Sequence, residues 1–224
     1  MEYGLQQDDL PRSPERLLEA DAPDDPLVLF DRWLEDAFAV RDVLVAAVPD
    51  RVLLEPTAMT VSTIADGRPR SRTVLLKKRT AQGLVFYTNL ESDKARELTA
   101  DPLVALQFVW PPLQRQVRIE GQARQVERES AEAYFATRPR QSQLGAWASP
   151  QSRVMTDAVE LDGHYRAAEG RFAGREVPCP PYWGGFVVDP DRIEFWQGRP
   201  GRMHDRLRYR RRDVDRWARD RLAP

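Results

Sequence analysis

The sequence predicts a mainly β fold with helical additions, in the α+β class, formed by one domain over residues 26–224. Short segments whose apolar side chains alternate with polar ones follow one another from residue 59 onward, separated by Gly, Pro and Asp. Helical spacing of apolar residues is confined to the N-terminal part and to the region between residues 128 and 172. Several short antiparallel strands with helices at the margins are typical of a small β-barrel.

The N-terminal part divides at Pro26. Residues 1–25 are rich in Asp, Glu and Pro and have little periodicity, which predicts a flexible arm or a lid. From Pro26 to Val48 the apolar positions recur every three to four residues, so we expect one amphipathic helix that Pro49 ends.

The remaining elements follow from changes of period and from turn residues. We expect the first three strands to form an antiparallel meander, and a short helix to begin after Ser92 and to stop at Asp101. Pro139 is expected to end the helix that precedes it. The predicted strands are residues 59–64, 71–77, 84–88, 103–110 and 114–126 and further strands from 183 to 217, and the predicted helices are 93–100, 128–137 and 152–172.

The composition excludes several classes of function. The 34 basic and 35 acidic residues leave a net charge of −1, which predicts no nucleic-acid or membrane partner. No apolar run is long enough to span a bilayer and the N-terminus does not resemble a signal peptide, so we expect a cytoplasmic protein. Cys179 is the only cysteine, and no Cys/His cluster indicates a metal site.

Two segments near the centre of the chain combine cations with hydroxyl groups. Arg72 and Lys77 point to opposite faces of a strand if the strand continues between them, so they do not easily bind one anion. Thr88, Ser92 and Lys94 lie where a strand ends and a helix begins, an arrangement that suits a phosphate. Solvated strand ends and ordinary helix capping explain the same patterns.

Two later segments are also candidates. Tyr134, Arg138 and Ser142 recur four residues apart and would suit a second phosphate, although a solvated helix end is an equal alternative. Arg202, His204 and Arg206 are spaced by two, which places them on one face of a strand, where they repel one another unless something anionic or electron-rich lies against them. Trp196 is either a core residue or a platform for a flat ring.

Together these segments resemble the pyridoxamine 5'-phosphate oxidase family, from about Asp25 to the end of the chain. The matching blocks occur in the family's order. They are RTVLLK at 72–77, FYTN at 86–89, RQV at 115–117, the YF…RPRQSQLGAW run at 134–147, QS at 151–152, WGGF at 183–186, EFWQG at 194–198 and RMHDR at 202–206.

The resemblance implies an FMN-binding split β-barrel that forms a homodimer, with FMN at the interface. The substrate's C4' would lie against N5 of the flavin for hydride transfer, O2 would be reduced to hydrogen peroxide, and the product would be pyridoxal 5'-phosphate, in vitamin B6 salvage. The implied flavin contacts are Arg72, Thr73, Val74, Leu75, Leu76, Lys77, Tyr87, Thr88, Lys94, Gln116, Gln151, Ser152, Trp196 and Arg206, with Arg72 and Lys94 at the phosphate. The implied substrate contacts are Lys77, Tyr134, Arg138, Ser142, Arg202, Met203 and His204, of which Arg202 and His204 would be catalytic, His204 as a candidate proton partner.

The chain departs from the family pattern at two places. Asp93 stands where many relatives have Arg, and an anion there weakens phosphate binding unless it turns outward. The N-terminal arm lacks the family's Arg-x-x-Tyr lid. Two alternative functions remain open: a flavin oxidase of the same fold that acts on a secondary-metabolite precursor such as a phenazine precursor, and a non-catalytic carrier of pyridoxal phosphate or FMN.

Overall fold

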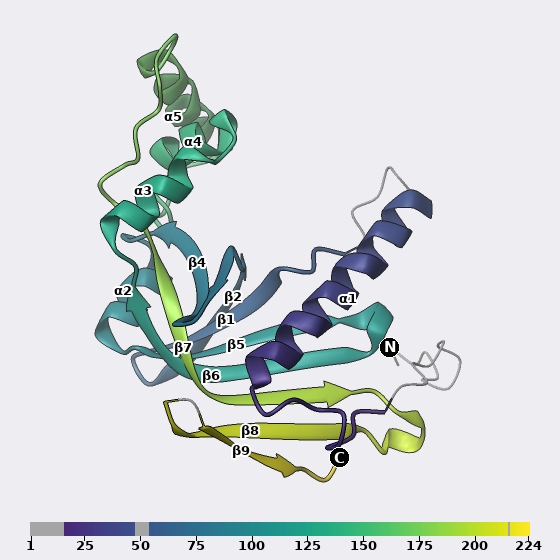
Figure 1. Ribbon diagram of the computed structural model, residues 1–224. Coiled ribbons are helices and arrows are strands. Elements are labelled where there is room, and N and C mark those ends of the chain that lie inside the picture. The colour runs from purple at the N-terminus through teal and green to yellow at the C-terminus, as the bar shows by residue number, and fades with distance from the viewer. Residues whose placement is uncertain (1–15, 48–53, 215) are drawn as a thin grey trace, which may run out of the picture.

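Alternating apolar residues build one nine-stranded antiparallel sheet, which dominates the computed structural model described here (Figure 1). The structure describes residues 16–47, 54–214 and 216–224. The strands are β1 (Ala58–Ala65), β2 (Arg68–Leu75), β3 (Lys78–Thr80), β4 (Gly83–Asn89), β5 (Leu103–Trp110), β6 (Arg115–Gln125), β7 (Trp183–Gln197), β8 (Asp205–Asp213) and β9 (Arg216–Arg221). The predicted mainly β fold with helical additions is confirmed.

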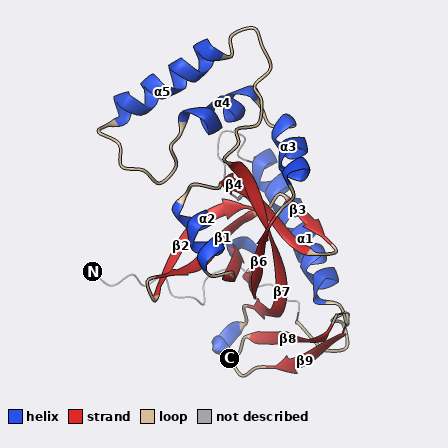
Figure 2. Cartoon of the chain, turned by 90° about the vertical axis from the view of Figure 1, so that its left-hand side faces the viewer, coloured by secondary structure: helices blue, strands red, loops and turns tan. Residues whose placement is uncertain are grey.

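Within the described residues, five α-helices accompany the sheet, and Figure 2 shows how they surround it. They are α1 (Pro26–Ala47), α2 (Asp93–Ala100), α3 (Arg128–Ala136), α4 (Arg140–Ala148) and α5 (Ala158–Arg171). The predicted bounds of α2 and of β5 are confirmed. The end of the helix at Pro49 lies outside the described residues.

The order of the strands differs from the predicted meander. The sheet runs β2-β1-β5-β6-β7-β4-β3, so β4 pairs with β7 and not with β2. The predicted strand over 71–77 was wrong at its end, because β2 stops at Leu75 and the chain then crosses to the far edge of the sheet. The Leu76 N–H donates to Thr57 O beside β1, and the Lys77 N–H donates to Val85 O in β4, both at 2.8 Å. The sheet is curved but not closed by strand pairing among the described residues.

Long β7 joins two parts of the sheet. Its first half pairs with β4 and its second half pairs with β8, while β6 runs along its other edge. Residues 16–25 lie against β8 and β9, where Tyr209 Oη donates to Pro23 O at 2.9 Å, Arg219 to Ala22 O at 2.6 Å and Arg221 to Leu17 O at 2.7 Å, among other contacts. Residues 1–15 of the arm predicted over 1–25 lie outside the described residues, so the flexible arm or lid stays a prediction.

Two apolar clusters form the core. The larger one packs α1 on the sheet, where Phe30 meets Phe108 at 5.0 Å between ring centroids and Trp33 meets Phe195 at 5.2 Å. The smaller one lies among α3, α4, α5 and the start of β7, in the helical group beyond the end of the sheet in Figure 1.

The prediction for the helical group needs two corrections. Pro139 does end α3, but a new helix, α4, begins directly after it, because a proline before the first turn needs no backbone hydrogen bond there. The predicted helix over 152–172 was too long, and α5 begins only after Asp157, whose side chain accepts the Glu160 N–H at 2.9 Å as an N-cap.

Candidate functional site

Lys94 lies at the centre of a polar cradle where β4 ends and α2 begins. Its Nζ is 2.8 Å from Gln151 Oε1, 3.2 Å from Thr88 Oγ1 and 3.3 Å from Ser92 Oγ. We call Thr88, Ser92, Lys94, Gln151 and Ser152 the cradle. The structure thus brings together five of the predicted residues from two segments that lie some 60 positions apart in the sequence.

The charge of Lys94 is only partly offset by the carboxylates of Asp93 and Glu97, which counteract the lowering of its pKa. Among the described residues, none places an acidic oxygen within ion-pair distance of Lys94 Nζ, and the contacts are all to neutral oxygens. Burial lowers the pKa of Lys94, and the positive charge of Arg72 lowers it further. A half-buried ammonium beside a second cation is the arrangement that a phosphate dianion stabilises, so the cradle fits the phosphate of FMN.

Arg72 reaches the same region from the core side of β2. Its Nη2 is 2.7 Å from Glu97 Oε2, and its Nη1 is 2.5 Å from Thr63 Oγ1. Thr63 also donates to Glu97 at 2.5 Å, and Glu97 and Thr63 are both buried. Arg72 is therefore held in one orientation by a carboxylate of α2 and a hydroxyl of β1.

Neither Glu97 nor Thr63 was predicted from the sequence to belong to the site. Glu97 carried a signal, because it lies one helical turn after Lys94 on α2. Thr63 carried another, since it occupies the buried face of β1 after Met59 and Val61, where a polar side chain needs a partner.

The Asp93 side chain is paired with Arg96 rather than with Lys94. The Asp93 Oδ1 is 2.5 Å from Arg96 Nη2, and Arg96 also donates to the Glu91 carbonyl. The Asp93 backbone N–H points the other way and donates to Ser152 Oγ at 3.2 Å. Ser152 has a left-handed backbone with φ of 69°, a conformation that costs a non-glycine residue of the order of 1 kcal/mol or more.

A second group of predicted site residues lies apart from the cradle. It contains Tyr134 and Arg138, two predicted substrate residues. The Arg138 guanidinium lies 4.1 Å from the centre of the Trp183 ring, and within the described residues its buried Nη1 has no hydrogen-bond partner. Burial lowers the pKa of Arg138 and raises that of Tyr134. A buried, unsatisfied N–H of a cation is costly, and an anionic ligand would satisfy it.

The ring of Tyr134 stacks on Tyr87, a predicted flavin residue. The ring centroids are 4.0 Å apart and the planes differ by 9°. Gly185 of β7 makes room for Tyr87, because a Cβ at this position would lie 2.7 Å from Tyr87 Cδ1. The stack links the two clusters, since Thr88 of the cradle follows Tyr87 in β4.

The other two predicted contacts of the substrate phosphate are Lys77 and Ser142. Lys77 is exposed between β2 and β3, and its charge helps to lower the pKa of Glu55, which the hydroxyl of Thr57 lowers most. Ser142 is half-buried in the first turn of α4, where its N–H donates to Pro139 O at 2.8 Å.

The remaining predicted flavin residues of the sheet lie on its two faces. Gln116 pairs with Val109 and Trp196, and Trp196 pairs with Arg206, so these four share one face. Thr73 and Leu75 are exposed on that same face, which also carries exposed Leu103 and Val109. Arg72 lies on the opposite face with Val74, and the Leu76 side chain is buried in the core. We call the face that carries Gln116, Val109, Trp196 and Arg206 the open face.

The predicted common strand face of Arg202, His204 and Arg206 was wrong. Strand β8 begins only at Asp205, and Arg202 ends a short 3-10 turn over Pro200–Arg202. Arg206 needs no external anion, because its Nε lies 2.8 Å from Glu194 Oε1 and its Nη1 donates to Ala223 O at 2.9 Å. Arg202 and Met203 are exposed.

His204 packs against Trp196, with 4.5 Å between ring centroids. Its Nδ1 accepts the Arg199 N–H at 3.1 Å, which places the proton of the neutral ring on Nε2. Burial lowers the pKa of His204, and the charge of Arg202 adds to the effect. The ring is therefore arranged to donate a hydrogen bond from Nε2.

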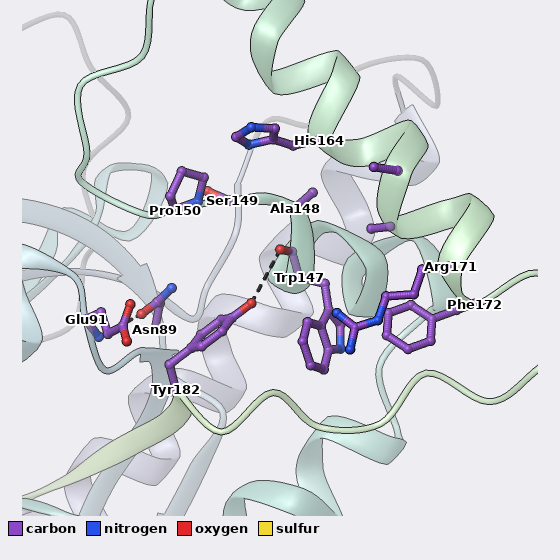
Figure 3. Close-up of a pocket in the computed structure, with 12 residues that line it drawn as sticks. Asn89, Glu91, Trp147, Ala148, Ser149, Pro150, His164, Arg171, Phe172 and Tyr182 are labelled. Atoms are coloured by element: carbon purple, nitrogen blue, oxygen red, sulfur yellow. Dashed lines mark hydrogen bonds between the residues drawn. The ribbon is translucent and has the colours of Figure 1, made fainter.

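A cavity of about 400 Å³ adjoins the cradle (Figure 3). Its wall includes Asn89 and Glu91 from the end of β4 and Ser149 and Pro150, which precede Gln151. Tyr182 lies across it and donates to the Trp147 carbonyl at 3.4 Å. It contains none of the predicted site residues.

Comparison with known proteins gives two matching family models. The model described as pyridoxamine 5'-phosphate oxidase matches residues 49–171, and the model described as the pyridoxine 5'-phosphate oxidase C-terminal dimerisation region matches residues 183–224. A relative from Pseudomonas paraeruginosa, named pyridoxine/pyridoxamine 5'-phosphate oxidase, is 50% identical over 209 residues, which is 93% of each chain.

Two solved structures illustrate the likeness of this chain to known folds. PhzG from Burkholderia lata, solved with tetrahydrophenazine-1-carboxylic acid, has a TM-score of 0.82 at 30% identity and covers 94% of this chain and 98% of its own. A pyridoxamine 5'-phosphate oxidase-related, FMN-binding protein from Nostoc punctiforme has a TM-score of 0.62 at 18% identity, over 82% of this chain and 97% of its own, which shows a shared fold. Among the described residues, no helix has both the length and the apolar character needed to cross a membrane.

Proposed function

The chain belongs to the pyridoxamine 5'-phosphate oxidase family, and from that premise we propose that it converts pyridoxamine or pyridoxine 5'-phosphate to pyridoxal 5'-phosphate. The cofactor is FMN. Bound FMN would accept a hydride from C4' of the substrate and pass two electrons to O2, which gives hydrogen peroxide. The amine substrate would also take up water and release ammonia.

One observation carries the proposal: within the described part of the chain, neither the Lys94 ammonium nor the Arg138 guanidinium forms an ion pair with a carboxylate. In the cradle, Lys94 is bounded by neutral oxygens, and beside it Arg72 is held by Glu97. At the other site, no residue in the described part of the chain accepts a hydrogen bond from the buried Nη1 of Arg138. Two phosphorylated ligands, FMN and the substrate, account for both.

The cradle would hold the FMN phosphate. Lys94 and Arg72 would supply charge, and the hydroxyls of Thr88, Ser92 and Ser152 would supply further hydrogen bonds. The N-terminus of α2 adds a favourable dipole. Because these groups are already placed by protein contacts, little ordering is needed when the phosphate binds.

Arg138 and Tyr134 would hold the substrate phosphate, with Lys77 and Ser142 as further contacts. The Trp183 ring keeps the Arg138 guanidinium in place, and the Tyr87 ring does the same for Tyr134. Arg202 and His204 would contact the pyridine ring. The Nε2–H of His204 would donate a hydrogen bond that orients the substrate. Because Nε2 already carries a proton, this supports a role in substrate positioning rather than as a general base.

The predicted flavin residues on two sheet faces support a site shared by two protomers. Arg72 and the cradle lie on one side of the sheet, whereas Gln116, Trp196 and Arg206 lie on the open face. A homodimer would bring the open face of one protomer to the cradle of the other, with FMN at the interface. Exposed Leu75, Leu103 and Val109 on the open face would be covered in the same contact.

The test begins with the FMN-loaded protein. Anaerobic addition of pyridoxamine 5'-phosphate should bleach the flavin absorbance, and air should restore it with stoichiometric peroxide and pyridoxal 5'-phosphate. Tight binding of pyridoxal 5'-phosphate without bleaching would contradict the proposal and indicate a carrier. Arg138→Ala should raise KM for the phosphorylated substrate about 10- to 100-fold, the loss of a charged hydrogen bond. Arg166→Ala, at an exposed position of α5, serves as the control.

A second candidate is favoured by the likeness to PhzG. A flavin oxidase of a phenazine precursor would use the same cradle but would have no need for a second phosphate site. Under this alternative the protein oxidises a tetrahydrophenazine carboxylic acid faster than pyridoxamine 5'-phosphate, and Arg138→Ala leaves that activity unchanged. A preference for the phosphorylated substrate that Arg138→Ala abolishes excludes it.

A further inference from the structure

The turn between β7 and β8 has a strained backbone that other contacts must hold. It spans residues 198–204, between the end of β7 and Asp205 at the start of β8, and carries Arg202 and His204. Gly201 and Arg202 both have a left-handed backbone, with φ of 63° and 59°. For glycine this conformation is free of strain, but for Arg202 it costs of the order of 1 kcal/mol or more and persists only when the surroundings impose it.

Two contacts of Arg199 close this turn. Its backbone N–H donates to His204 Nδ1 at 3.1 Å, and its side-chain Nε lies 3.8 Å from Asp205 Oδ2. The two ends of the turn are thereby joined beside the His204 ring. The orientation of that ring, and the nitrogen that carries its proton, depend on the position of Arg199.

The buried carboxylate of Asp205 holds the Arg199 side chain that closes the turn. Its side chain is only 5% exposed, and besides Arg199 it meets Arg221 Nη1 at 2.9 Å, Leu17 N at 3.2 Å and Arg16 Nη2 at 3.6 Å. A carboxylate so deeply buried is stable only when charged or hydrogen-bonding groups surround it. Asp205 thus ties the turn to β9 and to the segment that begins at Arg16.

We propose that Asp205 is a positioning residue: through Arg199 it holds the turn closed, which keeps the His204 proton on Nε2 and Arg202 in its left-handed backbone. Asp205 itself faces Arg199, Arg221 and Leu17 rather than the His204 ring, so it acts through the turn. The expected effect on turnover rests on the proposed function, because Arg202 and His204 contact a substrate only if that function is correct. The effect of Asp205 on the turn and on the His204 proton does not depend on it.

The sequence makes a direct test simple, because the chain has only two histidines, His164 and His204. With ¹⁵N-labelled histidine in the full-length, FMN-loaded protein, the ring nitrogens of each residue can be assigned by comparison with His164→Gln. We expect His204 to show a protonated Nε2 and an unprotonated Nδ1 near neutral pH. In Asp205→Asn and in Arg199→Ala, which keeps the backbone N–H but loses the ion pair, we expect a mixture of tautomers.

Matched variants separate positioning from general damage. Arg199→Lys retains a cation and should restore most of the Nε2–H form, while Asp220→Asn, which removes a carboxylate bound by Arg208 and Arg210, should leave His204 unchanged. If Asp205→Asn does not fold, Arg199→Ala decides the question alone. A His204 spectrum that stays the same in Arg199→Ala would overturn the proposal.

Kinetics supply the second readout. In Arg199→Ala, kcat for pyridoxamine 5'-phosphate should fall about 10- to 100-fold, the effect of a misplaced catalytic group, while FMN affinity stays unchanged. A protein that oxidises no B6 phosphate but loses the His204 tautomer in Arg199→Ala would contradict the proposed function and leave this inference intact. Normal turnover with an unchanged tautomer would overturn this inference alone.

Discussion

The guanidinium of Arg72 lies 2.7 Å from the buried carboxylate of Glu97, so the arginine proposed to bind the FMN phosphate is fixed by a contact within the protein. The contact has two effects. It orients Arg72 before the ligand arrives. It also leaves part of the positive charge of Arg72 for the phosphate, because the single negative charge of Glu97 is shared with Arg70, whose guanidinium lies 3.5 Å away.

Replacing Arg72 should weaken FMN binding. We expect Arg72→Ala to raise the FMN dissociation constant about 10- to 100-fold, because a charged hydrogen bond to the phosphate is lost. Arg70→Ala is the matched control, since Arg70 is half-exposed and contacts the same carboxylate, and it should change the constant at most about fivefold. Fluorescence titration of the apoprotein with FMN measures both. Equal effects would contradict a specific role for Arg72.

Lys94 should lower the stability of the apoprotein and raise its affinity for FMN. Burial and Arg72 lower its pKa, so the charged form costs stability in the apoprotein below the unfolded-state pKa, and this cost disappears as pH rises through the window between the two pKa values. We expect Lys94→Met to stabilise the apoprotein at neutral pH and to raise the FMN dissociation constant about 10- to 100-fold.

Urea unfolding without FMN and an FMN titration measure the two effects of Lys94→Met. Lys78→Met is the control, because Lys78 is exposed in β3 and should leave FMN affinity unchanged. Lower apoprotein stability in Lys94→Met would show that the ammonium is satisfied by its neutral neighbours alone.

The pair formed by Asp93 and Arg96 should tune FMN affinity modestly. Asp93 lies next to Lys94, but its carboxylate is bound by Arg96 at 2.5 Å, and both side chains are nearly half-exposed. Arg96→Ala frees the negative charge and should weaken FMN binding by up to about fivefold, whereas Asp93→Asn should strengthen it by a similar factor. The double variant should resemble Asp93→Asn. Both effects should shrink at high salt, and a titration in 0.05 M and 0.5 M salt, at roughly threefold different Debye lengths, checks this.

Glu19 gives a prediction for acid pH. Its hydrogen bond from Arg221 lowers the pKa to about 2 from 4.5. Because the folded-state pKa is depressed, the contribution to stability is present above about pH 4.5 and is lost as pH falls toward about 2. Glu19 is largely exposed to solvent, so we expect Glu19→Gln to cost only ~0.2 to 1 kcal/mol at pH 7.

The difference in unfolding free energy between wild type and Glu19→Gln should be constant from pH 7 to 5 and should narrow below pH 4.5. The control is Glu169→Gln at an exposed position of α5, which should show no such change. A difference that is as large at pH 3 as at pH 7 would contradict the assignment.

Much of the fold follows from local pattern. The alternation of β1, β5 and β6, the Asp66-Gly67 turn with φ of 53° and 71°, and the periodicity of α1 could all be read from the chain, because each depends on residues close in sequence. The meander could not be judged in this way. Whether β2 pairs with β4 depends on where the chain turns after Leu75, and two hydrogen bonds to separate strands decide that.

The sequence by itself determined which residue types could bind phosphates and in which blocks they occur, because strand ends, helix starts and cations are local features. Only the tertiary structure decided how they combine. It brought Gln151 to Lys94, placed Glu97 under Arg72, and paired Arg206 with Glu194, which removed an apparent charge repulsion. It also assigned the His204 proton to Nε2 through Arg199. The physical reason is that the pKa of a charged group and its ability to bind a phosphate depend on the groups within a few ångströms of it. Those groups come from distant parts of the chain.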